Sequence, residues 1–232
     1  MSNTSKAVDS SATASLERLV REAFEGFAGG DGHPCLGARS VVRRKAYDLH
    51  LYSRLGTVAA ARALNGDLAR FGRTVRHGEL TSFVAVFSEP TASSEARFSQ
   101  LLWRQLQRMH DLDRVNHPWD PSVSSDPDDP HFSFSVAGAA YFVVGLHSGS
   151  SRWARRFTWP ALIFNPHQQF TDLRESGDYD RLRALIRGRD TALQGSVNPA
   201  LRDYGVMSEA GQYSGLAVSD HWRCPLHVRH PE

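Results

Sequence analysis

In Ser82-Phe-Val-Ala-Val-Phe87, one serine is followed by an unbroken series of five apolar residues. It is rich in β-branched and aromatic side chains, which is typical of a strand buried on both faces. Three further strand patterns follow in the second half of the chain, at 132–136, 140–146 and 161–164. The link Ala137-Gly138-Ala139 between the first two of these predicts a hairpin.

Helical patterns surround these strands, with apolar residues at intervals of three and four. The first helix is expected to begin at Ser15, which suits an N-cap, and the longest one is expected to follow Ser93 or Ser94. The expected helices lie at 15–28, 38–45, 57–71, 94–110 and 179–186, and a short additional strand is expected at 47–52.

These patterns predict one α+β domain over 15–232, with a central, largely antiparallel sheet, packed helices and a loop-rich C-terminal third. The full chain of 232 residues is long enough to bury a substantial core. Residues 1–14 are rich in Ser, Thr and Ala and are expected to be a disordered leader. Residues 116–130 are rich in Pro, Asp and Ser and are expected to be a long loop.

The composition gives no support to two classes of protein, those that bind nucleic acid and those that span a membrane. The net charge of +2 gives no indication of nucleic-acid binding, and no apolar segment has the length of a membrane span. The two cysteines form no disulfide framework, so a reducing, cytoplasmic location is expected. Lys6 and Lys45 are the only lysines, and the many arginines are the residues that prefer carboxylates and phosphates as partners.

The segment His33-Pro-Cys-Leu-Gly-Ala-Arg39 puts Cys35 in a short turn before a helix-compatible segment. Backbone N–H donors and the positive end of a helix dipole lower the pKa of a thiol there, so Cys35 is expected to be a nucleophile, a redox group or an iron ligand. Cys-x-Gly at the head of a helix is how many heme-thiolate oxygenases hold the proximal sulfur. The alternative is a buried structural cysteine in a Pro/Gly turn.

Polar residues gather at the ends of the predicted strands. His147 follows the strand at 140–146, and His167 ends the motif Asn165-Pro-His167 after the next strand. A neutral imidazole there suits a metal or heme ligand, although the spacing is not that of a zinc site. Nearby arginines are candidates to hold carboxylates or heme propionates: Arg152, Arg155 and Arg156. The alternative is that the histidines are hydrogen-bonded to the backbone of turns and that the arginines are solvated at the surface.

The C-terminal region offers carboxylates for a cationic substrate, because a guanidinium pairs bidentately with a carboxylate. Glu209 and Asp203 are the candidates, although either could be a turn or surface residue. Cys224, which precedes a proline, is expected to be a packed cysteine. The sequence has no P-loop, no Rossmann glycine motif and no serine nucleophile elbow.

From about residue 30 to the C-terminus, a series of short motifs resembles the YqcI/YcgG family. The motifs are His33-Pro-Cys-Leu-Gly-Ala38, Gly145-Leu-His147, Ser151-Arg152, Ala154-Arg-Arg-Phe157, Asn165-Pro-His167 with Phe170, Arg189-Asp190, Leu193-Gln-Gly195, Asn198-Pro199, Ser208-Glu-Ala210, Gln212-Tyr-Ser-Gly215 and Trp222-Arg-Cys-Pro225. The understood members of that family, such as the arginine hydroxylase of the D-cycloserine pathway, are heme proteins that hydroxylate a guanidino nitrogen.

The resemblance implies a heme-dependent monooxygenase of natural-product biosynthesis that converts L-arginine, or a close guanidino derivative, to its Nω-hydroxy form. It implies heme b, one or two per chain, with O2 and an external reductase or ferredoxin, or with peroxide. The chain contains no FAD motif or ferredoxin-type cysteine series that would supply electrons internally. A homodimer is the default expectation.

The resemblance also suggests roles for the candidate residues. Cys35 would bind the heme iron, with His147 and His167 as competing axial ligands, and the arginine cluster would face the propionates together with His33 at the cofactor site. Glu209 would hold the guanidinium, which positions its nitrogen for reaction. The remaining expected substrate contacts are Gln212, Tyr213 and Asp203. Two alternatives stay open: a heme-binding or sensing protein without catalysis, and a heme-free hydrolase using Cys35 with a histidine.

Overall fold

The computed structural model describes residues 4–91, 94–199, 205–219 and 221–230. Its centre is one five-stranded sheet in the order β1-β2-β5-β4-β3. The first two strands pair in parallel, and every other neighbouring pair is antiparallel. The expectation of an α+β domain with a largely antiparallel sheet is therefore confirmed. The strands are β1 Tyr47–Arg54, β2 Ser82–Glu89, β3 Phe134–Val136, β4 Ala139–Leu146 and β5 Ala161–Pro166.

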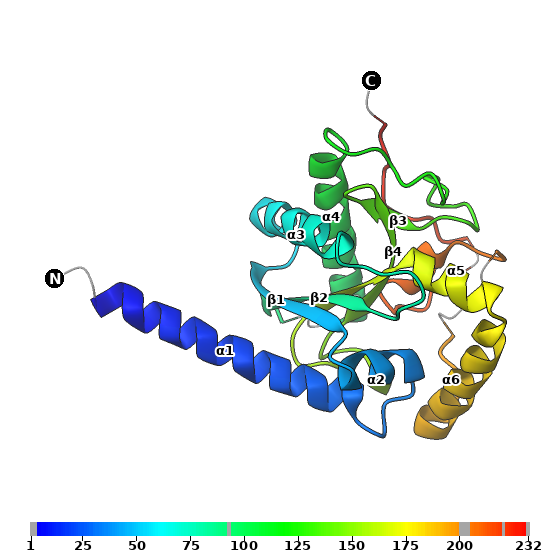
Figure 1. Ribbon diagram of the computed structural model, residues 1–232, viewed down its shortest axis with the longest axis horizontal. Coiled ribbons are helices and arrows are strands. Elements are labelled where there is room, and N and C mark those ends of the chain that lie inside the picture. Colours follow the sequence, from blue (N-terminus) through cyan, green and yellow to red (C-terminus); the bar gives the residue numbers. More distant parts are fainter. Residues whose placement is uncertain (1–3, 92–93, 200–204, 220, 231–232) are drawn as a thin grey trace.

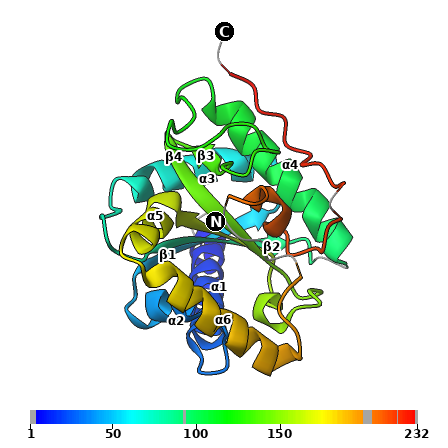
Figure 2. The same cartoon turned by 90° about the vertical axis from the view of Figure 1, so that its right-hand side faces the viewer.

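Helices cover both faces of this sheet. Helices α3 and α4 lie on one face, and α1, α2 and α6 lie on the other, with α5 near the edge where β5 ends (Figures 1 and 2). Two short 3-10 turns complete the described elements. The bounds are α1 Thr4–Gly29, α2 Leu36–Arg43, α3 Val58–Gly72, α4 Glu95–Asp113, η1 Trp153–Arg155, α5 His167–Glu175, α6 Asp178–Gln194 and η2 Glu209–Gln212.

The alternation of side chains along β2 divides the interior into two cores. Phe83, Ala85 and Phe87 belong to the core under α3 and α4. Val84 and Val86 belong to the core under α1 and α2. Because the strand is buried on both faces, its sequence is continuously apolar instead of alternating.

Local signals place several elements where the sequence predicts them. Ala137 and Gly138 have φ values of 55° and 72°, so they form the two-residue turn that joins β3 to β4 in a hairpin. Ser94 is the N-cap of α4, because its hydroxyl accepts a 3.2 Å hydrogen bond from the backbone N–H of Arg97. Ser93 lies outside the described residues.

Three helical elements differ from the expectation. Helix α1 begins at Thr4 instead of Ser15, since residues 4–14 contain no glycine or proline to interrupt it, and it projects from the body of the molecule (Figure 1). Helix α5 occupies a segment for which the sequence analysis predicts no helix. Helix α6 continues through Gly188 to Gln194, so the loop-rich region starts later than predicted. In the part of the chain that the structure describes, no helix combines the length and apolarity needed to cross a membrane.

Gly145 of β4 allows α4 to pack closely on the sheet. A Cβ built at this position would lie 2.5 Å from Phe98 Cε1 and 2.9 Å from Leu102 Cδ1. We expect Gly145→Ala to lower the free energy of unfolding by about 1–3 kcal/mol, because two buried side chains must move. Urea denaturation measures this change, with Gly188→Ala as the control, since a Cβ on Gly188 meets nothing within 4 Å. Equal midpoints for the two variants would contradict the packing argument.

Candidate functional site

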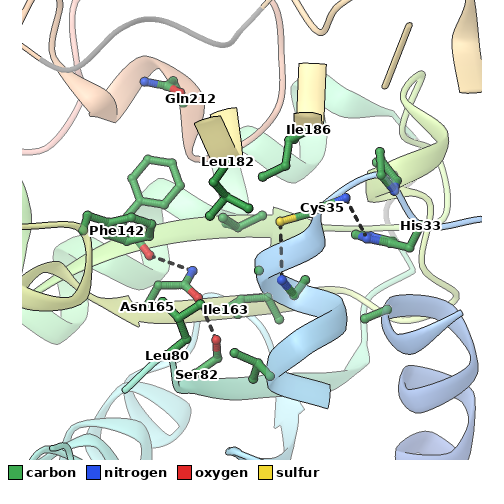
Figure 3. A pocket seen from close by; sticks show the side chains of 18 of the residues that line it. His33, Cys35, Leu80, Ser82, Phe142, Ile163, Asn165, Leu182, Ile186 and Gln212 are labelled. Carbon is green, nitrogen blue, oxygen red and sulfur yellow. Dashed lines mark hydrogen bonds between the residues drawn. The ribbon is translucent and has the colours of Figure 1, made fainter. Parts of the chain in front are cut away.

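A cavity of about 350 Å³ lies between the sheet and the helices α2, α5 and α6. Its volume is within the range of roughly 300–1,000 Å³ that is usual for small-molecule and cofactor sites. The strands contribute the floor, and Leu182 and Ile186 of α6 face it from the opposite side (Figure 3). Most of the lining side chains are apolar, and they include Phe24, Phe27, Val41, Val84, Phe142, Val144, Leu146, Ile163, Leu173, Leu182, Ile186 and Met207.

Cys35 lines this cavity as the N-cap of α2. Its backbone is extended, at φ −76° and ψ 104°, and its sulfur accepts a hydrogen bond from the N–H of Ala38 at 3.5 Å. The preceding Pro34 fixes the approach of the chain, and the sulfur points toward the cavity interior (Figure 3). The predicted turn geometry around Cys35 is therefore confirmed.

The expected lowering of the thiol pKa is wrong for the protein alone. Burial raises the pKa of Cys35, and this effect exceeds the opposite effect of the N–H groups of Ala38 and Gly37. The low polarity of the cavity disfavours a free thiolate. A bound metal ion would reverse this preference, because coordination deprotonates a thiol outright.

His33 supports the turn and does not act on the sulfur. Its Nδ1 accepts a 3.3 Å hydrogen bond from the backbone N–H of Cys35, and its ring packs edge-on against Phe27. Burial lowers the pKa of His33, so the imidazole is held neutral. A hydrolase would need a base hydrogen-bonded to the sulfur, and among the described residues the sulfur is contacted by backbone N–H groups, those of Ala38 and Gly37.

His147 lies away from the cavity. Its ring stacks on Phe98 of α4 with the centroids 4.3 Å apart, and it is 1% exposed. Its position continues the alternation of Tyr141 and Val143 in β4, whose side chains face the core under α3 and α4. Neither ring nitrogen has a hydrogen-bond partner among the described residues, and burial lowers the pKa of His147 to about 4. His147 therefore does not share a site with Cys35, and a second heme beside it stays a prediction.

His167 is the first residue of α5 and does line the cavity. Burial lowers its pKa to about 4, so the imidazole is neutral, which is the form that binds metals. Of the two histidines proposed to compete with Cys35 for iron, this one shares the cavity with the sulfur.

The arginine cluster has mainly structural partners. Arg152 donates to Asp190 at 2.6 Å and to the carbonyl of Ser196 at 2.7 Å. Arg155 donates to the carbonyl of Gln212 at 2.9 Å and to that of Tyr213 at 3.0 Å. Both arginines line the cavity, but these contacts hold η1, α6 and η2 together.

Arg156 does not line the cavity. Its Nε donates to the carbonyl of Ser150 at 2.9 Å, and its guanidinium lies 4.8 Å from the centre of the Trp153 ring. The arginines of the cavity that sequence reasoning missed belong to α5 and α6: Arg174, Arg183 and Arg187.

Glu209 is a buried carboxyl group on the cavity wall, 7% exposed. Ser133 donates to its Oε1 at 2.8 Å, and Tyr213 donates to the same oxygen at 2.5 Å. Both contacts fall on Oε1, so the hydrogen bonds from the described residues leave Oε2 open to a ligand. Burial raises the pKa of Glu209 to about 8, so the neutral form predominates at pH 7 until a cation binds.

Of the other expected substrate contacts, the structure places one on the cavity wall. Gln212 lines the cavity, with its side chain visible at the far end from Ser82 in Figure 3. Tyr213 is fully buried behind Glu209 and does not line the cavity. Asp203 lies outside the described residues.

Sequence reasoning also missed a polar pair on the cavity floor. The hydroxyl of Ser82 donates to Asn165 Oδ1 at 2.7 Å, and Asn165 Nδ2 donates to the carbonyl of Phe142 at 3.2 Å (Figure 3). Ser82 is the first residue of β2 and Asn165 lies next to the last residue of β5, and a polar residue at the end of an apolar series was the available signal. In α6, the spacing of Leu182 and Ile186 was the corresponding signal for a helix face over the cavity.

Among the described residues, no group of three or more His, Cys, Asp or Glu side chains is arranged to hold a metal ion by itself. In the comparison with protein families, the model of the YqcI/YcgG family matches residues 24–227. No curated protein and no solved structure matches the chain.

Proposed function

This chain belongs to the YqcI/YcgG family, and we propose that it is a heme-dependent monooxygenase that hydroxylates a guanidino nitrogen of L-arginine or a close derivative in natural-product biosynthesis. The observation that supports this most directly is one apolar cavity with a cysteine sulfur and a buried carboxyl group on its walls. The sulfur is a ligand suited to heme iron, and the carboxyl group is a partner suited to a guanidinium.

The residues of the cavity fit a heme in their chemistry. The apolar floor and α6 suit the faces of a porphyrin, and Cys35 offers its sulfur from one wall. Arginines of α5 and α6 line the same cavity and are the candidates to face the propionates, because Arg152 and Arg155 are engaged with protein partners. When bound, heme would supply the activated oxygen that no amino-acid side chain can supply.

Glu209 gives this cavity a means of selecting a cation. Its Oε2 would accept hydrogen bonds from the guanidinium, while Ser133 and Tyr213 hold Oε1 in place. Because the carboxyl group is buried, a charged partner would stabilise its ionised form strongly. The apolar walls exclude water, which strengthens this ion pair and fixes the position of the guanidino nitrogen.

The test of this proposal is an absorption spectrum of the full chain, expressed with a heme precursor. Spectra are recorded in the ferric state and in the ferrous state with carbon monoxide, before and after addition of L-arginine. We expect a Soret band that shifts with arginine, and a hydroxyguanidine product when electrons or peroxide are supplied. A colourless protein would contradict the proposal. A Soret band that ignores arginine, with no product, would favour a heme-binding protein without catalysis.

A further inference from the structure

Three oxidisable aromatic rings connect the cavity wall with the protein surface. Tyr213 and Trp103 are stacked, with ring centroids 5.7 Å apart and an interplanar angle of 22°. Trp103 and Trp222 follow, with centroids 6.0 Å apart. Tyr213 directly follows η2, Trp103 lies in α4 and Trp222 lies in the C-terminal segment, so the fold brings them together from three parts of the sequence.

Tyr213 is the inner end of this series. Its phenol donates a 2.5 Å hydrogen bond to Oε1 of Glu209, which lines the cavity. Its ring also packs edge-on against Phe142, another residue of the cavity wall, at 5.8 Å between centroids. When Glu209 is ionised, its carboxylate is a proton acceptor in contact with the phenol, and the phenol lies one residue away from the cavity.

Trp103 is the buried middle of the series, 5% exposed. Its Nε1–H has no hydrogen-bond partner among the described residues. Without an acceptor the oxidised indole keeps its proton and remains a strong oxidant, so a charge passes on instead of being trapped. Trp222, in the motif Trp222-Arg-Cys-Pro225, is partly exposed and packs against the core, which makes it the outer end.

We propose that Tyr213, Trp103 and Trp222 carry one-electron oxidation from the cavity to the surface. Tyr213 would give one electron to an oxidised heme iron in the cavity and its phenolic proton to the ionised carboxylate of Glu209, which becomes the neutral acid. An electron from Trp103 and the returning proton restore the phenol, and Trp222 then reduces Trp103. A thiol or similar one-electron reductant in solution reduces Trp222. The net change is one electron moved from that reductant to the oxidant, with no proton gained or lost by the protein.

The identity of the oxidant rests on the proposed function, but the path does not. The path can therefore be tested on the full chain without heme, by pulse radiolysis with azide radicals, which oxidise tryptophan. At about pH 9, where Glu209 is ionised, we expect tryptophanyl absorbance to decay while tyrosyl absorbance rises, because the oxidation follows the same path in the inward direction, at a rate independent of protein concentration. Trp103→Phe and Trp222→Phe should each lose this phase, and Tyr213→Phe should lose the tyrosyl product.

A matched control is available in Trp119. It lies 5.8 Å from Phe132 and 6.2 Å from Phe134, and Phe132 lies 6.5 Å from Tyr213, so phenyl rings that are not readily oxidised separate it from the tyrosine ring. Trp119→Phe should keep the phase. Glu209→Gln should slow tyrosyl formation, because an amide accepts the hydrogen bond but not the proton.

Two results would overturn the proposed path. One is that the conversion of tryptophanyl to tyrosyl absorbance is unchanged in both Trp103→Phe and Trp222→Phe. The other is that Trp119→Phe loses this conversion to the same extent. An unchanged rate in Glu209→Gln would remove Glu209 as the proton acceptor. Since Trp222 is at the surface, its variant keeps the test valid even if Trp103→Phe fails to fold.

Discussion

Replacing Cys35 with alanine is expected to abolish the thiolate spectrum of the heme-loaded protein and its hydroxylase activity. The sulfur lines the cavity at the head of α2, and it is the one thiol of the described residues in this position. A thiolate ligand pushes electron density onto iron and favours O–O cleavage, and alanine has no atom that can replace it. The measurement is the ferrous carbon monoxide spectrum, taken together with product formation from L-arginine.

Cys224→Ala is the matched control for this change. Cys224 is also a partly exposed free thiol, but it packs beside the opposite core and does not line the cavity. Its variant should keep both spectrum and activity. If Cys35→Ala keeps the spectrum while His167→Ala changes it, the iron ligand is the imidazole of α5, and the assignment to sulfur is wrong.

The sheet was predictable because its determinants are local. The apolar series of β2 and the Ala137-Gly138 link each specify their own geometry through burial or backbone conformation. The parallel direction in which β1 pairs with β2 was not predictable in the same way. Their parallel pairing is made across α3, and nothing in either strand alone distinguishes it from the antiparallel alternative.

The site was predictable where one short motif determines it. Cys35 lies in a turn that its own neighbours build, and Glu209 begins a 3-10 turn capped by Ser208. The protein partners of Arg152 and Arg155 come from segments about 40 to 60 residues away, at Asp190, Ser196 and Gln212. Sequence proximity to a strand end could not reveal those partners.

The position of His147 shows a second limit. Side chains alternate along β4, so a residue after the strand faces one side or the other according to its position. Phe142, Val144 and Leu146 face the cavity, while His147 stacks on α4. The alternation was visible in the sequence, but which side would hold the cavity depended on where α2 and α6 pack.

Replacing Glu209 with glutamine is expected to weaken L-arginine binding by roughly 10- to 150-fold, because a hydrogen bond to a charged group contributes about 1.5–3 kcal/mol. The wild-type affinity should also depend on pH. Burial raises the pKa of Glu209 to about 8, so below that pH most of the protein carries the neutral acid. Since the guanidinium selects the carboxylate, affinity should rise about tenfold per pH unit up to about pH 8 and then level off.

Calorimetry on the wild-type protein, in buffers of different ionisation enthalpy, measures both the affinity and the proton released on binding. Binding below pH 8 should release a proton, because the bound cation lowers the pKa of Glu209. Glu209→Gln should remove this release along with the pH dependence, whereas Glu175→Gln, at an exposed carboxylate of α5, should change neither. Pairing between the guanidinium and Glu209 requires that the carboxyl group be ionised. A wild-type affinity that stays constant from about pH 6 to about pH 8 would therefore mean that the guanidinium does not pair with Glu209.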